Sequence, residues 1–354
     1  MSPEGKAILL LTPGFPESET DSTCLPLQQQ LVKALQKQFP QLTLVVLSFQ
    51  YPYTRREYSW NGTPVIPFNG RNRGHLYRRW RQRTILQSVT TLKKKYAIAG
   101  VLSCWYGECA VLGEKIGRQL QVPHYCWALG QDARATNPFP SKLRLRPSRL
   151  LALSDFIQRE MEKNHGIKPG RVLYPGIDTT LFSRDKTEKY IDLLGAGSLI
   201  PLKQFEIFIA VVEALHSTNP GLRATLIGDG PERERLEALA AKAGLTGTVT
   251  FTGELPYPAV LRHMQQSRIL LHPSSYEGFG MVCQEALFAG ASVISFVRPV
   301  DKEVPHWHIV ADKTEMIAQA RTLLSQQPVT TEPVLFRSIE ETAREMVSLF
   351  FEYK

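Results

Sequence analysis

The chain has 354 residues, of which 43% are hydrophobic and 21% are charged, and its formal net charge is +9. These proportions are ordinary for a folded globular protein and exclude a disordered chain, a coiled coil and a collagen-like fibre. Because a domain has about 150 residues, the length predicts two domains, each with its own hydrophobic core.

The positive charge is concentrated in the first half of the chain. Residues 1–180 contain 25 Lys and Arg against 12 Asp and Glu, whereas residues 181–354 contain 17 against 21. Segment 54–95 alone has 11 basic residues and a single acidic one, Glu57. Such a segment predicts an anionic partner, which is a membrane surface, a nucleic acid or a phosphorylated substrate.

The sequence has no pattern typical of a transmembrane or metal-binding protein. No apolar run approaches the ~20 residues that span a bilayer, and the short run 7–11 predicts a buried strand rather than a signal peptide. The five cysteines show no Cys-x-x-Cys pair and no metal-ligand spacing, which favours free thiols in a reducing cytosol. We therefore expect a cytoplasmic protein without a metal site.

Short apolar runs alternate with helical patterns along the whole chain. In the first half the expected strands are 7–11, 42–49, 100–103, 123–128 and 150–153, and the expected helices are 25–38, 76–95 and 110–120. In the second half the expected strands are 190–195, 223–227, 249–252, 269–272 and 292–296, with helices at 205–215 and 232–243. Because the strands are apolar on both faces, this α/β pattern predicts parallel sheets covered by helices.

The turn-rich residues 175–178 mark the boundary between two such units. We expect two doubly wound, Rossmann-like domains at 1–180 and 181–337, and a final helix within 338–354. Two sheets of this kind face a central cleft, and ligands bind at the carboxyl ends of the strands. Candidate functional residues should therefore directly follow strands.

The densest motif, Ser274-Ser275-Tyr276-Glu277-Gly278-Phe279-Gly280, follows the expected strand 269–272 and leads into a helix that contains Glu285. Its two glycines leave backbone N–H groups open to a ligand, at a helix N-terminus that favours anions. Carboxylates accept hydrogen bonds from hydroxyl groups, so Glu277 and Glu285 suit a sugar ligand. The alternatives are a dipole-stabilised acid at the helix start for Glu277 and an exposed helix residue for Glu285.

Two further turns follow strands in the second half. The run Gly195-Ala196-Gly197-Ser198-Leu199-Ile200-Pro201-Leu202-Lys203 combines a tight turn with a cation that can hold a phosphate as a point charge. An ordinary solvated lysine is the alternative for Lys203. The run Gly228-Asp229-Gly230-Pro231 places Pro at the first position of a helix, and by itself favours plain turn chemistry.

In their order and spacing these motifs resemble the family 4 retaining glycosyltransferases, the glycosyl transferases group 1, which have the GT-B fold. The resemblance covers about residues 150–296 and rests most on Glu277-Gly278-Phe279-Gly280 with Glu285, the E-x7-E pattern of that family. It also includes Ser154 at a helix start, Tyr174-Pro175-Gly176-Ile177-Asp178, the turn ending in Lys203, Leu226-Ile227-Gly228-Asp229-Gly230-Pro231 and Val249-Thr250-Phe251-Thr252-Gly253. In this fold the C-terminal helix often crosses back to the first domain.

The resemblance implies a role for each of these residues. Lys203 would bind the nucleotide diphosphate, Glu277 would lie near the reacting face of the donor sugar, and Glu285 would hold the ribose hydroxyls. The turn departs from the family at Ser198, where an arginine is usual. The other donor-binding candidates belong to the same loops or to the first strand's end: Gly14, Gly197, Ser198, Gly228, Gly278, Phe279 and Gly280.

In the first half, Leu129-Gly130-Gln131-Asp132 falls where many relatives have a His-Gly-x-Asp loop facing the donor sugar. Asp132 is therefore a third catalytic candidate beside Glu277 and Lys203, with a helix cap or a turn as its alternative role. Leu129 replaces the histidine, so no catalytic histidine is carried over. Trp105-Tyr106-Gly107-Glu108 follows another strand, where it lines the acceptor side or only packs.

The function that the resemblance implies is retaining, metal-independent hexosyl transfer. A sugar would pass from a nucleotide-diphosphate sugar to an acceptor hydroxyl, in glycan, polysaccharide or glycolipid synthesis, with no cofactor. Lys203 and the amides near Gly280 would stabilise the leaving diphosphate. Three alternatives remain: a degenerate GT-B protein that binds a nucleotide sugar or glycan without turnover, which Ser198 and Leu129 favour; a nucleic-acid-binding protein, which leaves the second half unexplained; and a GT-B epimerase.

Segment 71–95 has the pattern of a basic amphipathic helix, whose apolar residues are Leu76, Trp80, Leu86, Val89 and Leu92. One interpretation is peripheral binding to an anionic inner membrane leaflet, with Trp80 at the interface. The other is an apolar stripe that packs on the protein's own sheet beside a solvated basic face. Under either interpretation, the density of positive charge in this segment predicts an anionic, lipid-linked or membrane-borne acceptor.

Overall fold

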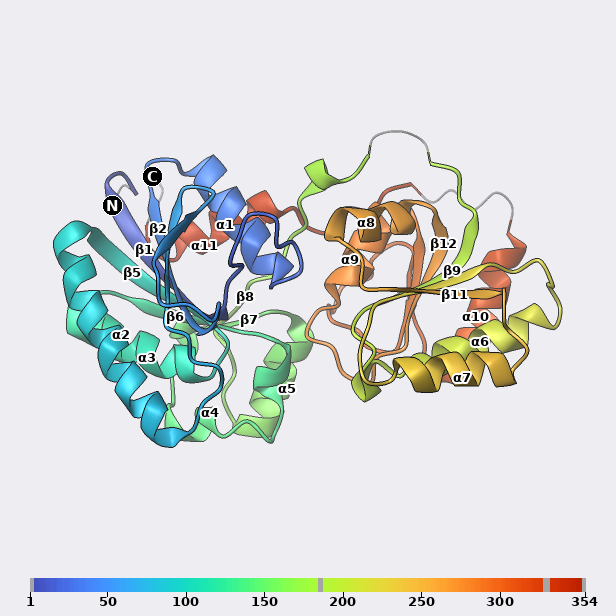
Figure 1. The fold of residues 1–354 in the computed structure, drawn as a ribbon, viewed down its shortest axis with the longest axis horizontal. Coiled ribbons are helices and arrows are strands. Elements are labelled where there is room, and N and C mark those ends of the chain that lie inside the picture. Colours follow the sequence, from blue (N-terminus) through green and yellow to red (C-terminus); the bar gives the residue numbers. More distant parts are fainter. Residues whose placement is uncertain (1–2, 184–186, 327–331, 352–354) are drawn as a thin grey trace. The chain divides into compact units, whose positions relative to one another are not determined.

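The computed structural model describes residues 3–183, 187–326 and 332–351. The chain forms two compact units, Met1–Asp178 with Arg337–Lys354, and Thr179–Phe336 (Figure 1). These boundaries lie one or two residues from those expected from the turn-rich segment. Each unit has its own sheet, so each is described by itself.

The sheet of the first unit has eight strands among the described residues. Their order is β3 (Tyr58–Trp60), β4 (Thr63–Pro67), β2 (Thr43–Tyr51), β1 (Lys6–Gly14), β5 (Ala97–Cys104), β6 (His124–Ala128), β7 (Leu150–Ala152) and β8 (Arg171–Val172). Every neighbouring pair is parallel except β3 with β4. The strand order reverses direction at β1, so a gap opens between the loops that follow β1 and β5.

Helices cover both faces of this sheet. On one face lie α2 (His75–Lys95) and α3 (Glu108–Leu120), whose apolar residues form one core with those of β1, β2 and β5. On the other face α1 (Pro26–Gln38) packs against α11 (Ile339–Ser348), the helix near the C-terminus (Figure 1). The shorter α4 (Phe139–Lys142) and α5 (Asp155–His165) follow β6 and β7.

Helix α2 departs from the stripe expected from its sequence. Its C-terminal half buries Val89 and Leu92 on the sheet, but Leu76 is 83% exposed and Trp80 is 47% exposed. Arg81, expected on a solvated basic face, is 1% exposed instead. The interpretation as self-packing therefore holds for the C-terminal half of the helix and is wrong for its first turns.

The β3–β4 hairpin was not expected from the sequence, although its signal is present. Asn61 and Gly62 form a two-residue turn with φ of 45° and 81°, the positive values that an Asn-Gly turn in a tight hairpin requires. The strands on either side are only three and five residues long. Such short strands give too few residues for an alternating pattern to stand out.

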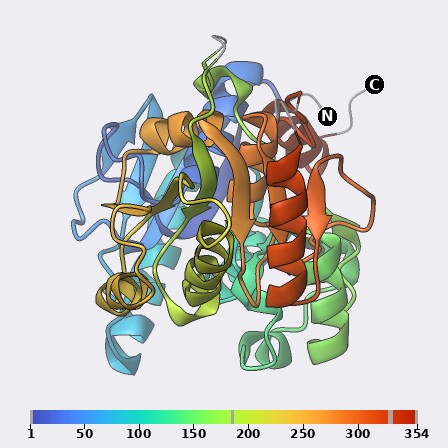
Figure 2. The ribbon, with the colours of Figure 1, turned by 90° about the vertical axis from the view of Figure 1, so that its right-hand side faces the viewer.

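The second unit contains a six-stranded parallel sheet within the described residues. Its order is β11 (Val249–Gly253), β10 (Ala224–Ile227), β9 (Ile191–Ala196), β12 (Ser267–His272), β13 (Ser292–Ser295) and β14 (Trp307–Ile309). The covering helices are α6 (Phe205–His216), α7 (Arg233–Lys242), α8 (Tyr257–Gln265), α9 (Met281–Phe288) and α10 (Lys313–Ser325), the last seen in red in Figure 2. The order reverses between β9 and β12, which makes that point the expected ligand site of this sheet.

The segment that rejoins the first unit is held by a close backbone contact. Ile177 pairs with Ser338, and the N–H of Ile339 donates to the carbonyl of Ile177 at 2.8 Å. A Cβ atom placed on Gly176 would lie 2.0 Å from the carbonyl oxygen of Ser338. Gly176 is therefore needed because no side chain fits, and this contact anchors α11 on the first unit.

We expect Gly176→Ala to lower the free energy of unfolding of the protein by about 2 kcal/mol, because backbone must shift to admit the methyl group. Thermal unfolding followed by circular dichroism measures the change. Gly74→Ala is the matched control, since nothing lies within 4 Å of a Cβ at Gly74. An equal melting temperature for the two variants would contradict the role of Gly176.

Candidate functional site

The reversal point of the second sheet brings together two charged residues that are far apart in the sequence. Lys203 follows β9 in a short 3₁₀ turn, and Glu277 follows β12. The Lys203 ammonium group forms an ion pair with Oε2 of Glu277. Nε2 of His272, the last residue of β12, lies 3.3 Å from the same oxygen. The two predicted site residues therefore meet, because the structure places β9 beside β12.

The loops that carry these residues are tied to each other through the backbone. The N–H of Ser275 donates to the carbonyl of Leu202 at 3.1 Å, and its hydroxyl donates to the same oxygen at 3.2 Å. Because both bonds end on the residue before Lys203, they fix the ammonium group relative to Glu277. The side chain of Ser198, in the same turn, is exposed to solvent.

The charge state of this cluster follows from its contacts. Burial by itself would raise the pKa of Glu277, but the hydrogen bond from His272 and the charge of Lys203 outweigh it and lower that pKa to about 2. Burial lowers the pKa of His272. At neutral pH the cluster therefore contains one cation, one anion and a neutral imidazole that donates a hydrogen bond.

Two predicted glycines allow backbone to pack on backbone beside this cluster. A Cβ atom on Gly228, whose φ is 134°, would lie 2.0 Å from the carbonyl oxygen of Gly197. The N–H of Gly197 donates to the carbonyl of Ile227 at 3.0 Å, and the N–H of Leu199 donates to that of Asp229 at 2.9 Å. The turns after β9 and β10 are thus joined directly, with no side chain between them.

Glu285 lies inside α9 and is buried, not exposed. Its Oε1 accepts a hydrogen bond of 2.6 Å from the hydroxyl of Tyr257, at the start of α8. Burial raises the pKa of Glu285 to about 7, and the Tyr257 hydroxyl opposes this increase. Tyr257 was not predicted, because one tyrosine near a helix start carries no signal in a single sequence.

The loop before α9 presents backbone rather than side chains. Gly280 has a φ of 77°, a left-handed conformation that glycine adopts without strain. The ring of Phe279 is 2% exposed and packs at 5.5 Å from Phe336 and 6.3 Å from Trp307, measured between ring centroids. Gly278, Phe279 and Gly280 therefore have only main-chain groups to offer a ligand.

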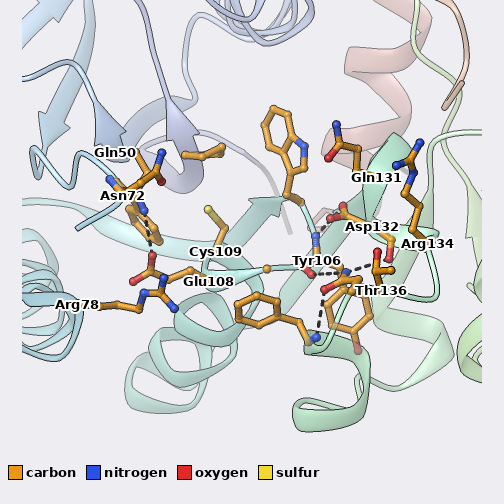
Figure 3. Close-up of a pocket in the computed structure, with 16 residues that line it drawn as sticks. Gln50, Asn72, Arg78, Tyr106, Glu108, Cys109, Gln131, Asp132, Arg134 and Thr136 are labelled. Carbon is orange, nitrogen blue, oxygen red and sulfur yellow. Dashed lines mark hydrogen bonds between the residues drawn. The ribbon is translucent and has the colours of Figure 1, made fainter. Parts of the chain in front are cut away.

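The reversal point of the first sheet carries a pocket of about 710 Å³ (Figure 3). Its wall comes from residues at or after the carboxyl ends of four strands: Pro13, Phe49, Gln50, Trp105, Tyr106, Glu108, Gln131 and Asp132. Arg78 of α2 and Thr136 and Asn137 complete the rim. The pocket is polar and open, and its size suits a sugar-sized ligand.

Asp132 holds the wall of this pocket together. Its Oδ2 accepts a hydrogen bond from the N–H of Tyr106 at 2.7 Å (Figure 3). It also accepts one from the N–H of Leu129 at 2.8 Å. Burial raises its pKa to about 7, although both hydrogen bonds act in the opposite direction. The cap and turn role that the sequence left open is thus present, and the residue also lines the pocket.

A buried ion pair behind the pocket was not predicted. Arg81 pairs with Glu108, its Nη1 donates to Oε1 of Gln50 at 2.9 Å, and Nε2 of Gln50 donates to Glu108 at 3.2 Å. A Cβ on Gly70 would lie 1.7 Å from Nη1 of Arg81. Oε1 of Glu108 is buried and has no hydrogen-bond partner among the described residues.

Gly14 ends β1 next to this pocket but is not among its lining residues. A Cβ placed there would meet neighbours at 3.7 Å, an ordinary contact distance. The structure therefore gives no steric reason for glycine at this position, unlike at Gly228. Its predicted donor contact stays a prediction.

The described residues contain neither a metal-binding cluster nor a membrane-spanning helix. No group of three or more His, Cys, Asp and Glu side chains is placed to hold a metal ion there. No helix in the same part of the chain has the length and apolar character to cross a membrane.

The second unit is similar in sequence to a known family. Residues 177–323 match the family model described as glycosyl transferases group 1. A D-inositol 3-phosphate glycosyltransferase of Acidothermus cellulolyticus is 31% identical over 158 residues, 39% of this chain and 35% of that protein. A 2-deoxystreptamine N-acetyl-D-glucosaminyltransferase of Streptomyces fradiae is 30% identical over 131 residues, 34% and 31% of the two chains. The alignments thus span about a third of these curated relatives.

Solved structures extend the similarity to both units. Anabaena HepE, solved in complex with UDP and glucose, superposes with a TM-score of 0.67 at 18% identity, over 98% of this chain and 95% of the other. Sucrose-phosphate synthase of Thermosynechococcus elongatus gives 0.66 at 18% identity, with the same coverage. Residues 177–323 are therefore similar to the glycosyl transferases group 1, and the chain has the GT-B fold of these structures. Both were predicted from the motifs and are confirmed.

The buried carboxyl of Glu285 makes stability depend on pH. Between its ordinary pKa of 4.5 and its folded pKa of about 7, the unfolded chain has lost a proton that the folded chain retains. Stability therefore falls as pH rises through this window, by up to about 3 kcal/mol for one such group. We expect Glu285→Gln to remove this part of the pH dependence.

Urea unfolding of wild type and variant at pH 5, 6 and 7 measures the difference. Glu234→Gln, on the exposed face of α7, is the matched control and should leave the profile unchanged. A Glu285→Gln profile parallel to that of the wild type would show that this carboxyl titrates normally.

Proposed function

We propose that the chain is a retaining glycosyltransferase that moves a sugar from a nucleotide-diphosphate sugar to an acceptor hydroxyl. The observation that carries the proposal is the Lys203–Glu277–His272 cluster at the reversal point of the sheet in the unit that matches the family. The UDP and glucose in the HepE structure support a uridine nucleotide as the donor. The pathway we propose is glycan, polysaccharide or glycolipid synthesis.

In the proposed donor complex, the diphosphate meets Lys203 and the backbone of the neighbouring turns. Because Lys203 is already paired with Glu277, an incoming phosphate competes with that carboxylate for the ammonium group. A released Glu277 accepts hydrogen bonds from sugar hydroxyls, and His272 remains beside its carboxylate. Glu285 with Tyr257 receives the ribose hydroxyls.

The proposed chemistry is mainly electrostatic. The bond between the sugar's anomeric carbon and the diphosphate oxygen breaks, and its electron pair leaves with the diphosphate. The acceptor oxygen bonds to the anomeric carbon on the same face, and the departing diphosphate takes up its proton. Lys203 stabilises the charge that develops on the diphosphate, which is where a fixed cation contributes most to the rate. In this proposal no metal ion and no cofactor takes part.

The proposed acceptor site is the pocket of the first unit. Glu108 places a carboxylate in the wall of this pocket, and Arg78 brings a guanidinium group to its lining. A ligand with hydroxyls and an anionic group satisfies both. This arrangement supports a glycan acceptor that carries negative charge.

The first turns of α2 support peripheral binding at the cytoplasmic face of a membrane. Leu76, Trp80 and Tyr53 are large apolar side chains with 83%, 47% and 57% exposure. Cations accompany the aromatic rings, with Arg55 at 4.7 Å from Trp80 and Arg71 at 4.8 Å from Tyr53. Exposed aromatic and aliphatic residues among arginines are typical of surfaces that bind anionic lipids.

We expect Lys203→Ala to lower the rate of sugar transfer from UDP-glucose or UDP-N-acetylglucosamine by at least about 100-fold, because the leaving diphosphate loses its cation. Release of UDP in the presence of acceptor measures the rate, with and without EDTA. Lys242→Ala, an exposed lysine in the same unit, is the control. Equal rates in the two variants would refute the proposed site, and loss of activity in EDTA would refute metal independence.

We expect the protein to co-sediment with vesicles containing phosphatidylglycerol in a salt-sensitive manner, and Leu76→Ser to reduce the bound fraction several-fold. Leu239→Ser removes an exposed leucine from the second unit and serves as the control. Binding that is the same for both variants would show that α2 does not form the membrane contact.

A further inference from the structure

A second pocket of the first unit lies at the opposite edge of its sheet from the proposed acceptor site. It has a volume of about 610 Å³ and is lined by the end of α3, by His124 at the start of β6, and by the segment that leads into β7. Because parallel strands all begin at this edge, it is the edge where the fold places no catalytic loops. Neither the sequence motifs nor the proposed reaction uses it.

Cations dominate the lining of this pocket. Its charged residues are Glu114, Arg118, Arg144, Arg146 and Arg149. A smaller adjoining hollow shares Glu114, Arg118 and Leu143 with it and adds Lys115 and Lys142. Among the described residues that line the two hollows, six are basic and one is acidic.

The single carboxylate is already engaged and does not neutralise the pocket. Oε1 of Glu114 accepts from Arg118 at 2.9 Å, and its Oε2 lies 3.3 Å from Nδ1 of His124. The hydrogen bond from His124 is the main reason why the pKa of Glu114 falls to about 2. Glu114 therefore stays on these two partners and leaves Arg144, Arg146 and Arg149 without a carboxylate.

The floor of the pocket is built around the buried ring of His124. Its Nε2 lies 2.9 Å from Oγ of Ser103, and burial lowers its pKa. A Cβ on Gly113 would lie 2.3 Å from Nε2, so α3 makes room for the ring with a glycine. A neutral imidazole held between Ser103 and Glu114 fixes the carboxylate without adding charge.

Two of the three remaining arginines are held in place by groups that leave their charge uncompensated. Arg149 lies over the ring of Tyr125 at 4.6 Å, and Nη2 of Arg144 donates to the carbonyl of Gly166 at 3.3 Å. Arg146, between them, is exposed and has no side-chain partner among the described residues. The positive charge is therefore preorganised around the pocket.

The segment that carries these arginines is also anchored to the wall of the proposed acceptor pocket. The hydroxyl of Tyr106 donates to the carbonyl of Leu143 and accepts from the N–H of Leu145 at 3.1 Å. The backbone N–H of Tyr106 is bound to Asp132. One tyrosine thus links the two edges of the sheet.

We propose that this arginine pocket binds a phosphate-bearing small molecule at a site separate from the reaction. Guanidinium groups bind phosphate through paired hydrogen bonds, and Arg146 has all of its donors available for this contact. The volume suits a sugar phosphate or a nucleotide rather than a bare ion. The same chemistry fits a free metabolite or the headgroup of a lipid.

Calorimetric titration of the full chain with inorganic pyrophosphate tests the site. We expect saturable binding that Arg146→Ser weakens at least about 10-fold, because a charge-assisted contact is lost. Arg321→Ser, on the exposed face of α10 in the second unit, removes the same charge and should bind as the wild type does. Because the Arg146 side chain is exposed and has no hydrogen bond or ion pair among the described residues, the variant should fold normally.

Pyrophosphate is also a ligand for the proposed donor site. The variant Lys203→Ala therefore separates binding at that site from binding at the arginine pocket. We expect this variant to retain the Arg146-dependent binding, and loss of all binding in Lys203→Ala would overturn the arginine pocket. Binding that is equal in wild type and Arg146→Ser would overturn it as well. The same variants with phosphatidic acid vesicles identify the source: Arg146-dependent sedimentation assigns the phosphate to a lipid, and binding of free pyrophosphate alone assigns it to a metabolite.

Discussion

The ion pair between Lys203 and Glu277 is the interaction on which the proposed donor site depends. It exists because the strand order of the second sheet places the loops after β9 and β12 side by side, although the two residues are 74 positions apart. His272 completes it by donating a hydrogen bond from the strand end. A partly buried pair of this kind contributes little to stability, because desolvation offsets the attraction. We infer that it is kept for the position and charge of the lysine.

The strand order of the first sheet also brings the loops of two neighbouring strands together, but there they form a pocket. There the loops after β1 and β5 enclose a pocket, and the cation at its back, Arg81, is buried on Glu108. Burying this pair requires a glycine at position 70, whose missing side chain leaves space for the guanidinium group. The lysine of the second unit can exchange partners, whereas Arg81 is fixed. Lys203 is therefore suited to reversible ligand binding, and Arg81 to a structural role in the pocket wall.

The sequence predicted most of the strands and the positions of Lys203 and Glu277 directly after two of them, because compact apolar runs and the residues that follow them are local features. It did not predict the ion pair between the two residues, which depends on the strand order. Arg81 could not be singled out, since it lies among arginines that share its local pattern and differ only in what packs against them. Tyr257 and the role of Asp132 were hidden for the same reason: both depend on contacts between segments that a single sequence does not reveal. The β3–β4 hairpin is different, because Asn61-Gly62 is a recognisable hairpin-turn signal in the sequence. It was missed only because the flanking strands are too short to show an alternating pattern.

The net charge acquires a more specific meaning from the structure. The sequence alone locates the excess of positive charge in segment 54–95 and predicts one anionic partner for it. In the structure Arg81 does not contribute to this excess, because it forms an ion pair with Glu108. A second group of cations, Arg144, Arg146 and Arg149, lines another pocket. These three arginines lie outside segment 54–95, at the opposite edge of the first sheet from the proposed acceptor pocket. Because the two groups line different pockets of the first unit, we propose that each acts on its own ligand. A basic chain of this kind therefore presents distinct anion sites rather than one uniform positive surface.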